Sequence, residues 1–462
     1  MRNNSGNKHS LLLVLIIISS FINPFLGASI NIALPTIGQE FSLSASGLSW
    51  VAMSFLLTSA VFLVPLGKLA DIVGRKRIFL YGNILIAASS LACALSPSGN
   101  FLIILRGIQG IGSAMVFGTG IAIITSAYPP NKRGKAIGII VTSVYVGLSL
   151  APFIGGILTE YLGWRSIFYL TVPFELIIIL GTWIFIKDEW ADAKGESFDY
   201  TGSFIYVISM SAFMFGFSKF PESFALILTS AGILGLILFV FYEMRIEYPV
   251  FNINLFKSNR LFALSNLAAL INYATTFAIT FLMSLYLQYA LGLSPRDAGI
   301  ILVTQPVVMA IVASISGRLS DKYDPRILAS SGMAVTVSGL ILLIFLNSET
   351  TTPYLILSLA IVGIGFGMFS SPNTNAIMGS VDKKFLGIAS ATVGTMRLTG
   401  QMISMGIATL VLQIFIGEGQ ITSHNIPDFI GSMKTTFIIF ALLCLLGVFA
   451  SLARGKAEKS GS

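Results

Sequence analysis

Fourteen predominantly apolar runs, each about 20 residues long, follow one another along this sequence of 462 residues. A run of that length matches the hydrocarbon core of a bilayer, where no water is present to satisfy the backbone of a spanning segment. Because an α-helix satisfies its own backbone hydrogen bonds, each run predicts a transmembrane helix rather than a strand. We place the helices at residues 11–33, 46–67, 78–97, 101–124, 135–158, 166–186, 200–219, 224–244, 262–290, 297–317, 327–347, 353–378, 386–416 and 432–453.

The composition agrees with an all-α integral membrane protein. Hydrophobic residues make up 55% of the chain and charged residues only 10%, whereas soluble domains carry about 25% charged residues. The run that starts at Leu11 is too long for the apolar region of a cleaved signal peptide, so we expect it to remain as the first transmembrane helix. The cysteines, Cys93 and Cys444, lie far apart in apolar runs and the histidines, His9 and His424, lie outside them, so neither a disulfide framework nor a metal site is expected.

The lysines and arginines predict how the chain is oriented in the membrane. In a soluble protein the net charge of +8 would raise nucleic acid as a partner, but here the basic residues occupy short loops between apolar runs. Cationic loops are retained on the cytoplasmic side. With both termini inside, Arg106 and Arg397 lie within helices and only four basic residues are external, namely Arg165, Lys219, Arg296 and Lys434. We therefore expect a multi-pass protein of the cell (plasma) membrane with both termini cytoplasmic and no nucleic-acid partner.

An internal repeat divides the chain. The sequence GKLAD, at Gly67–Asp71, recurs as GRLSD at Gly317–Asp321, and the glycine pair of 110–112 recurs at 363–365. The first acidic loop joins helices 2 and 3 and its copy joins helices 10 and 11, so six helices belong to each repeat and two are inserted. We predict an N-terminal six-helix bundle at 1–190, two inserted linker helices at 191–255 that pack outside the core, and a C-terminal six-helix bundle at 256–462.

The stretch GKLADIVGRKR, at Gly67–Arg77, resembles the loop signature of the major facilitator superfamily. Six further stretches resemble its fourteen-helix drug:proton antiporter branch: NIALP (31–35), LRGIQGIGSA (105–114), GLSLAPFIGG (147–156), EYPVFNINLF (247–256), YLQYALGLSPRDAG (286–299) and RLTGQ (397–401). Together they cover nearly the whole chain in the expected order. The resemblance implies a major-facilitator-type fold whose two halves open alternately around a central site, and the export of hydrophobic or cationic small molecules, such as drugs, in exchange for protons.

Several residues are candidates for gating. Gly67 and Gly74 permit a tight backbone path, and Asp71 and Arg75 place charge at helix ends, in a loop that resembles the family's latch for the cytoplasmic gate. Asp321 is the acidic residue of the copy. Helix 5 adds small residues and a proline at Gly147, Pro152, Gly155 and Gly156, a motif that resembles the exporters' pivot, while Arg397 lies deep in helix 13. The alternatives are that the basic loop residues only set topology and that the helix 5 glycines only allow close packing.

Two charged residues inside helices are candidates for proton coupling. Arg106 resembles the family's helix 4 arginine, with snorkelling to the interface as the alternative. Glu175 is the one carboxylate near the middle of a predicted span, and burial there disfavours its charged form, as a proton carrier requires. Its alternative is a neutral side chain hydrogen-bonded to a neighbouring helix. Family members often carry an aspartate at the position of Leu26, a glycine at that of Ala151 and a small residue at that of Glu175, so the coupling residues cannot simply be copied.

The central cavity is expected to be lined by polar and aromatic residues from both halves. The candidates are Asn23, Asn31, Asn272, Tyr273, Gln288, Gln305, Asn373 and Gln401.

Other classes of protein find little support in the sequence. No G-x-x-x-x-G-K-[ST] pattern is present to cradle ATP, and no catalytic dyad or sizeable soluble domain points to an enzyme. We expect a monomer that works with a small-molecule substrate, protons and the lipid bilayer, with no cofactor and with the proton gradient as its energy source. The alternatives are a facilitator or symporter for a specific metabolite, favoured by the missing acid at Leu26, and a non-transporting membrane sensor.

Overall fold

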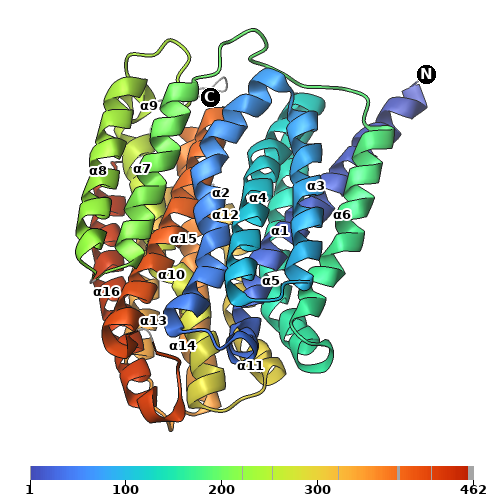
Figure 1. Ribbon diagram of the computed structural model, residues 1–462. Helices are drawn as coiled ribbons and strands as arrows, with labels where there is room; N and C mark the ends of the chain where they lie inside the picture. The colour runs from blue at the N-terminus through green and yellow to red at the C-terminus, as the bar shows by residue number, and fades with distance from the viewer. Residues whose placement is uncertain are drawn as a thin grey trace. The chain divides into compact units, whose positions relative to one another are not determined.

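The computed structural model describes residues 2–455 except Pro221, Asn252, Asp321, residues 382–385 and Glu418 (Figure 1). Throughout these residues the regular elements are helices, and fourteen of them are long and apolar enough to cross a membrane. The predicted all-α membrane architecture is therefore confirmed.

The chain begins with six long helices joined by short connections. They are α1 (Arg2–Phe41), α2 (Ala45–Val73), α3 (Arg75–Ala94), α4 (Gly99–Ala127), α5 (Pro130–Leu162) and α6 (Arg165–Phe185). A longer segment then leads to α7 (Tyr200–Ser218), which is followed by α8 (Ser223–Glu243).

The second half of the chain is interrupted more often. Its elements are the short α9 (Asn254–Ser258), α10 (Arg260–Leu285), the π-helix η1 (Tyr286–Ala290), α11 (Pro295–Leu302), α12 (Thr304–Leu319), α13 (Pro325–Ile344), α14 (Thr352–Gly379), α15 (Leu386–Ile416), the 3-10 turn η3 (Ser423–Asn425) and α16 (Ile426–Ala453). By length and hydropathy, α10 and η1 form one candidate span, and α11 and α12 form another.

Capping residues explain where several helices begin. The Ser98 side chain accepts a hydrogen bond from the Phe101 backbone at the start of α4, and Asn259 caps α10 in the same way. Ser294 and Asp324 cap α11 and α13, in each case with a proline at the first helical position. A side-chain oxygen satisfies a backbone N–H that would otherwise lack a partner, and proline costs nothing there because it has no N–H.

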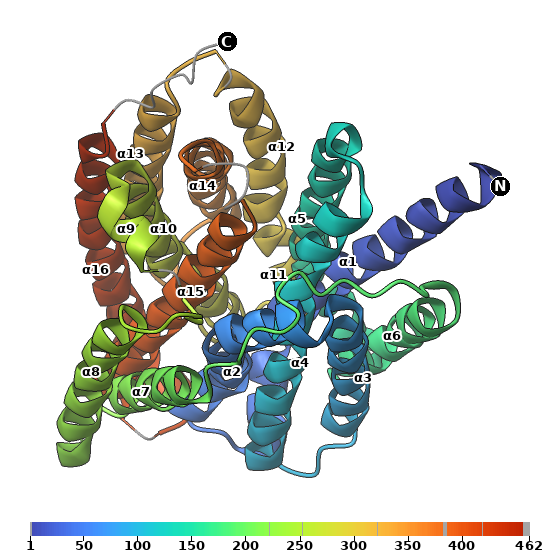
Figure 2. The same ribbon diagram turned by 90° about the horizontal axis from the view of Figure 1, so that it is seen from above.

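Two compact units make up the chain. Unit 1 comprises Met1–Leu43, Trp50–Phe213 and Ser230–Phe251, and unit 2 comprises Ser44–Ser49, Met214–Thr229 and Asn252–Ser462. In unit 1, α1 packs on α4, α5 and α6, and α3 packs on α4 and α6. In unit 2, α14 packs on α10, α12, α13 and α15, and α16 packs on α10, α13 and α15. Figure 2 shows the helices from above.

The boundary between α2 and α3 differs from the prediction. We expected helix 2 to end at residue 67, but α2 continues to Val73, and Gly74 alone separates it from α3. Gly74 has a φ of +129°, a backbone conformation that side-chain-bearing residues rarely adopt. Gly67 instead lies inside α2 with no other atoms within 4 Å of the position a Cβ would take. The predicted loop is therefore the last turns of a helix followed by a one-residue turn.

The first helix is also longer than predicted. We expected it to end at residue 33, but α1 continues to Phe41 with Pro24 and Pro35 inside it. The polar residues Gln39 and Glu40 lie in the last turn of this helix.

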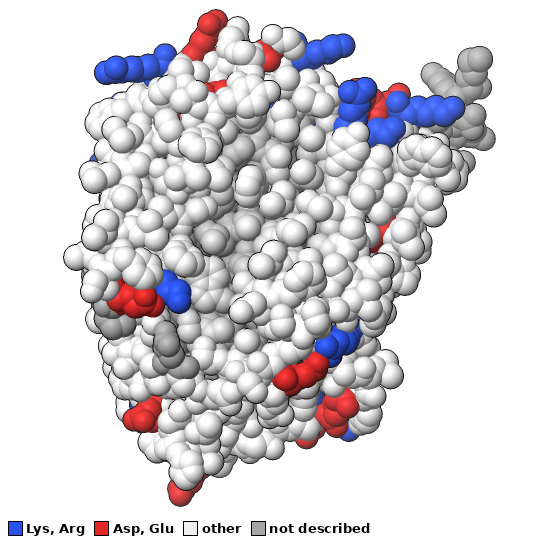
Figure 3. Space-filling model, in the orientation of Figure 1, with Lys and Arg blue, Asp and Glu red and all other residues white. Residues whose placement is uncertain are grey.

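Charged side chains gather around the ends of the helices. On the face drawn in Figure 3, blue and red atoms form a few separate groups, and most of the surface between these groups is white. This distribution suits a hydrocarbon layer around the middle of the helices, since charged side chains are costly there.

Glycines let α13 and α14 approach closely. A Cβ built at Gly332 would lie 2.6 Å from the Phe369 backbone nitrogen and 2.7 Å from the Gly365 oxygen. Close approach of this kind provides the van der Waals contact that holds helices together in lipid, where burial from water no longer drives association.

We expect Gly332→Ala to destabilise the protein, because the added methyl group forces α13 away from α14. The loss should be about 1–3 kcal/mol, the usual effect of overpacking, and thermal unfolding in detergent measures it. Gly379→Ala is the matched control, since Gly379 belongs to α14 and no other atom lies within 4 Å of its would-be Cβ. Equal melting temperatures for Gly332→Ala and the wild type would contradict the close contact.

Candidate functional site

Arg75 is the centre of an ionic cluster at the α2–α3 turn. Its guanidinium group is 2.6 Å from Asp71 and 2.7 Å from Asp192, and its Nη1 donates to the Ser126 hydroxyl of α4 at 2.5 Å. The side chain is largely buried. Two of the predicted gating residues, Asp71 and Arg75, are thus in direct contact, whereas their counterpart Asp321 lies outside the described residues.

The segment 187–199, which we call the strap, lies across this turn. The Arg75 backbone N–H donates to the Trp190 oxygen at 2.8 Å, and the Ala193 N–H donates to the Asp71 oxygen at 2.9 Å. The Glu189 side chain accepts from the Lys76 N–H at 2.8 Å and occupies the space beside Gly74 that a Cβ would need. Backbone hydrogen bonds as well as ion pairs therefore hold the strap to the α2–α3 turn.

Two further ion pairs join the strap to the same turn. Lys68 pairs with Glu196 at 2.5 Å, and Arg77 pairs with Glu189 at 3.6 Å. Our sequence interpretation missed the strap because we treated 191–255 only as linker helices. The sequence does carry a signal, since the strap is acid-rich and the α2–α3 turn is basic.

The helix 5 motif packs against α1. A Cβ at Gly155 would lie 3.0 Å from the Ser29 Cβ, and one at Gly147 would collide with the Phe21 oxygen. Pro152 lies inside α5, and Gly156 is buried beside it. Of the predicted pivot residues, Gly147 and Gly155 therefore lie on the seam between α1 and α5, where a larger side chain would separate the two helices.

Arg106 is fully enclosed in unit 1. Its Nε donates to the Val51 oxygen of α2 at 3.3 Å, and its Nη1 donates to the Gln109 side chain at 2.5 Å. Gln109 donates in turn to Ser90 of α3, and the guanidinium group lies 4.5 Å from the centre of the Phe55 ring. Its Nη2 has no hydrogen-bond partner among the described residues. Because the side chain is buried, it does not reach an interface by snorkelling.

Glu175 lies on the buried side of α6. The stripe that α6 turns inward comprises Ile167, Phe168, Thr171, Glu175, Ile178, Gly181 and Thr182. This helix packs on α1, α3 and α5, and a Cβ at Gly181 would lie 2.7 Å from Leu15 of α1. Neither carboxyl oxygen of Glu175 has a hydrogen-bond partner in the described part of the chain. The alternative of a glutamate hydrogen-bonded to a neighbouring helix therefore finds no support in this geometry.

The polar cavity candidates in unit 2 differ in whether their side chains have hydrogen-bond partners. Asn272 of α10 is fully buried, and neither of its side-chain polar atoms has a partner in the described structure. The Gln305 Oε1 of α12 is likewise buried without a partner. The Tyr273 ring contacts Phe366 of α14 edge-on at 5.3 Å, and Gln288 of η1 donates to Ser284.

Asn373 is committed to a structural cluster in unit 2. Its Oδ1 accepts from Arg454 at 2.6 Å, and its Nδ2 donates to the Ser265 oxygen at 3.0 Å. Arg454 also donates to the Ser265 hydroxyl and the Pro325 oxygen, so it joins α10, α13 and α14 just after α16 ends. Burial lowers the pKa of Arg454 to about 10, which leaves it charged at neutral pH. The sequence did not single out Arg454, because a lone arginine after a helix is usually a topology signal.

The remaining candidates are placed as follows. Asn23 and Asn31 are buried in α1, where the Asn23 Nδ2 donates to the Ser19 oxygen at 3.2 Å. Arg397 and Gln401 lie one turn apart in α15 and are partly exposed.

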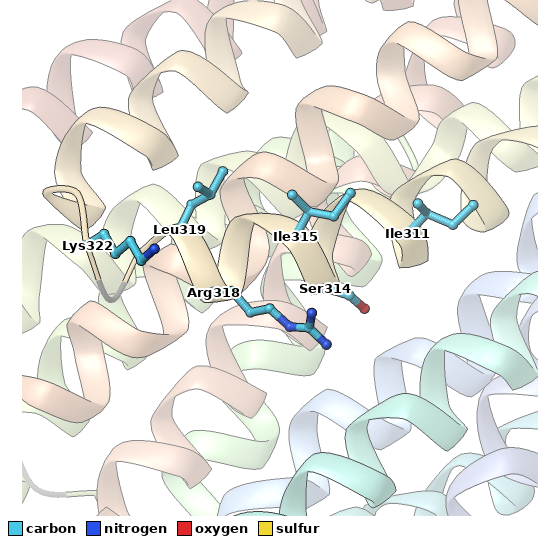
Figure 4. Close-up of a pocket in the computed structure, with 6 residues that line it drawn as sticks. All are labelled: Ile311, Ser314, Ile315, Arg318, Leu319 and Lys322. Carbon is cyan, nitrogen blue, oxygen red and sulfur yellow. The ribbon is translucent and has the colours of Figure 1, made fainter.

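One hollow of about 480 Å³ lies along α12. It is lined by Ile311, Ser314, Ile315, Arg318, Leu319 and Lys322. Figure 4 shows these side chains on successive turns of the helix and just beyond it, with Lys322 at one end and the Arg318 side chain extending toward Ser314. None of them was a cavity candidate. Within the described residues, no three His, Cys, Asp or Glu side chains come together as a metal site.

The comparisons with known proteins establish the family. The family profile described as Major Facilitator Superfamily matches residues 16–267 and 265–462. The chain therefore belongs to the Major Facilitator Superfamily, a family of membrane transporters, as the loop signature predicted.

Its relatives include proteins with different named substrates. The chain is 28% identical to the riboflavin transporter RibZ of Clostridioides difficile, with 96% of each protein covered. It is 29% identical to the multidrug resistance protein Stp of Mycobacterium tuberculosis, over 84% of this chain and 73% of that protein. It is also 27% identical to the multidrug transporter protein MdtP of Bacillus subtilis, over 94% of this chain and 81% of that protein.

Solved structures share the fold. A bacterial homologue of the human lysosomal transporter Spinster has a TM-score of 0.67 and 17% identity, with 98% of this chain and 97% of that chain covered. A peptide transporter POT has a TM-score of 0.70 and 16% identity, with 94% and 93% covered.

We expect Asp192→Asn to loosen the strap, because it removes one of the two carboxylates that hold Arg75. Asp192 is more than half exposed, so its pair is worth only about 0.5 kcal/mol, which corresponds to about a twofold faster tryptic cleavage after Lys194. Asp188→Asn is the control, since Asp188 is exposed and forms no ion pair with any described residue. Equal cleavage rates in all three proteins would show that Asp192 does not hold the strap.

Proposed function

We propose that this chain is a secondary transporter that exports hydrophobic or cationic small molecules in exchange for protons by alternating access. The family membership and the relatives named as multidrug proteins support the transport class and the kind of substrate. The observation that carries the proton part is the Glu175 carboxyl group, which is fully buried in unit 1 without a hydrogen-bond partner among the described residues.

The environment of Glu175 is suited to a group that binds and releases a proton. A carboxylate left unpaired in a low-dielectric interior is costly, whereas the protonated form is tolerated. Ionisation therefore favours any conformation in which α6, α1 or α3 moves enough to admit water. Proton binding and release at Glu175 would then be linked to a change of conformation, which is what an exchanger requires.

Arg106 has the complementary role in this proposal. It is a buried cation with one nitrogen unsatisfied and no carboxylate paired with it among the described residues. A positive charge held there favours proton release from carboxyl groups that come near it, and it can attract an anionic group when the bundle opens.

The arrangement in the cell forms part of the same proposal. We propose a multi-pass protein of the cell membrane with both termini cytoplasmic, acting as a monomer without a cofactor and without chemical conversion of its substrate. The two six-helix halves are 1–190 and 256–462, and 191–255 supplies the inserted helices. The proposed gating residues are those at the α2–α3 turn, those in the repeat of its sequence at Gly317–Asp321, and those at the α1–α5 seam. The buried polar groups of α1, α10 and α12 are the cavity candidates.

A second candidate function is the transport of one specific metabolite. The relative with 96% coverage is named a riboflavin transporter, which makes a flavin the first metabolite to test.

Transport into inverted vesicles with an acidic interior separates the two candidate functions. A panel of hydrophobic cations should raise the internal pH if the chain is a drug exchanger, whereas a response to riboflavin alone would favour the specific transporter.

We expect Glu175→Gln to abolish this substrate-induced rise in internal pH, because a glutamine cannot carry the proton. The variant should fold normally, with an unchanged or higher melting temperature, since a buried carboxyl without a partner is removed. Glu349→Gln is the control, because Glu349 is exposed between α13 and α14. Undiminished proton exchange by Glu175→Gln would remove Glu175 from the mechanism.

A further inference from the structure

Two carboxyl groups face one another where α7 begins and α8 ends, both within unit 1. Asp199 immediately precedes α7, and Glu243 is the last residue of α8. A Cβ built at Gly202 would collide with Oδ2 of Asp199 and would lie 2.6 Å from Oε1 of Glu243, so both oxygens flank the same point. The two carboxyl groups therefore lie close together.

The other oxygen of each group has its own donors. Oδ1 of Asp199 accepts from the Gly202 N–H at 2.9 Å and from the Tyr242 hydroxyl at 3.2 Å. Oε2 of Glu243 accepts from the Phe251 N–H at 2.9 Å. The oxygens that face one another, Oδ2 and Oε1, are buried and have no donor among the described residues.

Among the described residues, no positive charge is paired with either carboxyl group. Glu243 is only 3% exposed. The titratable group that faces the pair is Tyr242, whose hydroxyl group donates to Asp199. On the adjoining segments, Glu196 is paired with Lys68, and Glu247 and Arg245 are exposed. Two ionised carboxylates at this separation would repel each other strongly.

We propose that Asp199 and Glu243 form a proton-binding site, in which one proton is shared between Oδ2 of Asp199 and Oε1 of Glu243. A single proton supplies the donor that both oxygens lack and removes one of the two charges. The bond formed is an O–H···O⁻ bond, which is among the stronger hydrogen bonds in proteins. The site is separate from Glu175, and it stands whether or not Glu175 couples transport to protons.

The proton also controls the segment that follows α8. Glu243 accepts from the Phe251 N–H in the same position in which its side chain lies beside Asp199. Loss of the proton to water leaves two carboxylates, and their repulsion moves Glu243 away and frees the Phe251 N–H. Residues 244–251, which lead toward α9 and α10, are therefore docked when the pair holds its proton and released as the pH rises.

Hydrogen exchange of the full-length protein in lipid nanodiscs tests the site. Exchange is measured for residues 245–251 from about pH 5 to about pH 9, the range in which a buried carboxyl pair loses its proton. Asp199→Asn supplies a permanent N–H donor to Oε1 of Glu243. In this variant, residues 244–251 should therefore stay docked over the whole pH range. One linked proton changes the docking equilibrium about tenfold per pH unit. The ratio of wild-type to Asp199→Asn exchange rates should rise with pH by that factor, and this ratio removes the intrinsic pH dependence of exchange.

Two further variants make the test decisive. Glu243→Gln keeps an acceptor for Phe251 and gains a donor toward Asp199, so it should also stay docked and serves if Asp199→Asn does not fold. Glu247→Gln, an exposed change in the same segment, should keep the wild-type profile. Identical pH profiles for wild type and Asp199→Asn would overturn the proposal. Protection that increases with pH, or on addition of sodium or calcium ions, would also overturn it, because a metal cation would then hold the pair together.

Discussion

The absence of water in the core of a bilayer is the constraint on which the rest of this structure depends. It requires every spanning segment to be a helix, and it makes each unsatisfied polar side chain in a span expensive. Many hydroxyl groups in the described spans meet this requirement locally. Thr119, Thr159 and Thr409 each donate to the carbonyl oxygen four residues earlier in their own helix. Against that background, Glu175, Arg106 and Asn272 stand out, because parts of their side chains are buried without partners among the described residues.

Charge is used at the helix ends to tie elements together. In unit 1, Arg75 and the strap bind the turn where α3 begins. At the other end of α3, Arg165 pairs with Glu40 of α1 at 2.7 Å and donates to the Ser96 oxygen, and Glu40 also accepts from the Trp164 indole at 2.7 Å. These clusters fix the ends of helices whose middles carry the unpaired groups. Ion pairs hold the ends of these helices together, and a few buried polar groups without partners among the described residues lie between those ends. This arrangement is well suited to rigid-body motion between discrete states.

Much of the fold could be predicted from the sequence, because hydrophobic length is a direct consequence of bilayer thickness. The number of spans and the family followed from apolar runs and the GKLADIVGRKR stretch. The exact ends did not, since α1 continues through Pro35 and α2 through Asp71. The site was less accessible, because hydrogen-bond partners depend on which helices are neighbours. The bond between Asn373 and Arg454 and the closeness of Asp199 to Glu243 each bring together residues that are far apart in sequence.

The two-repeat arrangement can be tested most directly by asking which face of the membrane each gating loop occupies. Arg77→Cys and Lys322→Cys place one exposed thiol beside each loop, and Glu349→Cys marks the opposite face. The native Cys93 and Cys444 are fully buried, so they need not be removed. In oriented vesicles, we expect a membrane-impermeant maleimide to label Arg77→Cys and Lys322→Cys only from the cytoplasmic side and Glu349→Cys only from the outside. Labelling of the first two from opposite sides would contradict a chain built from two matched six-helix halves.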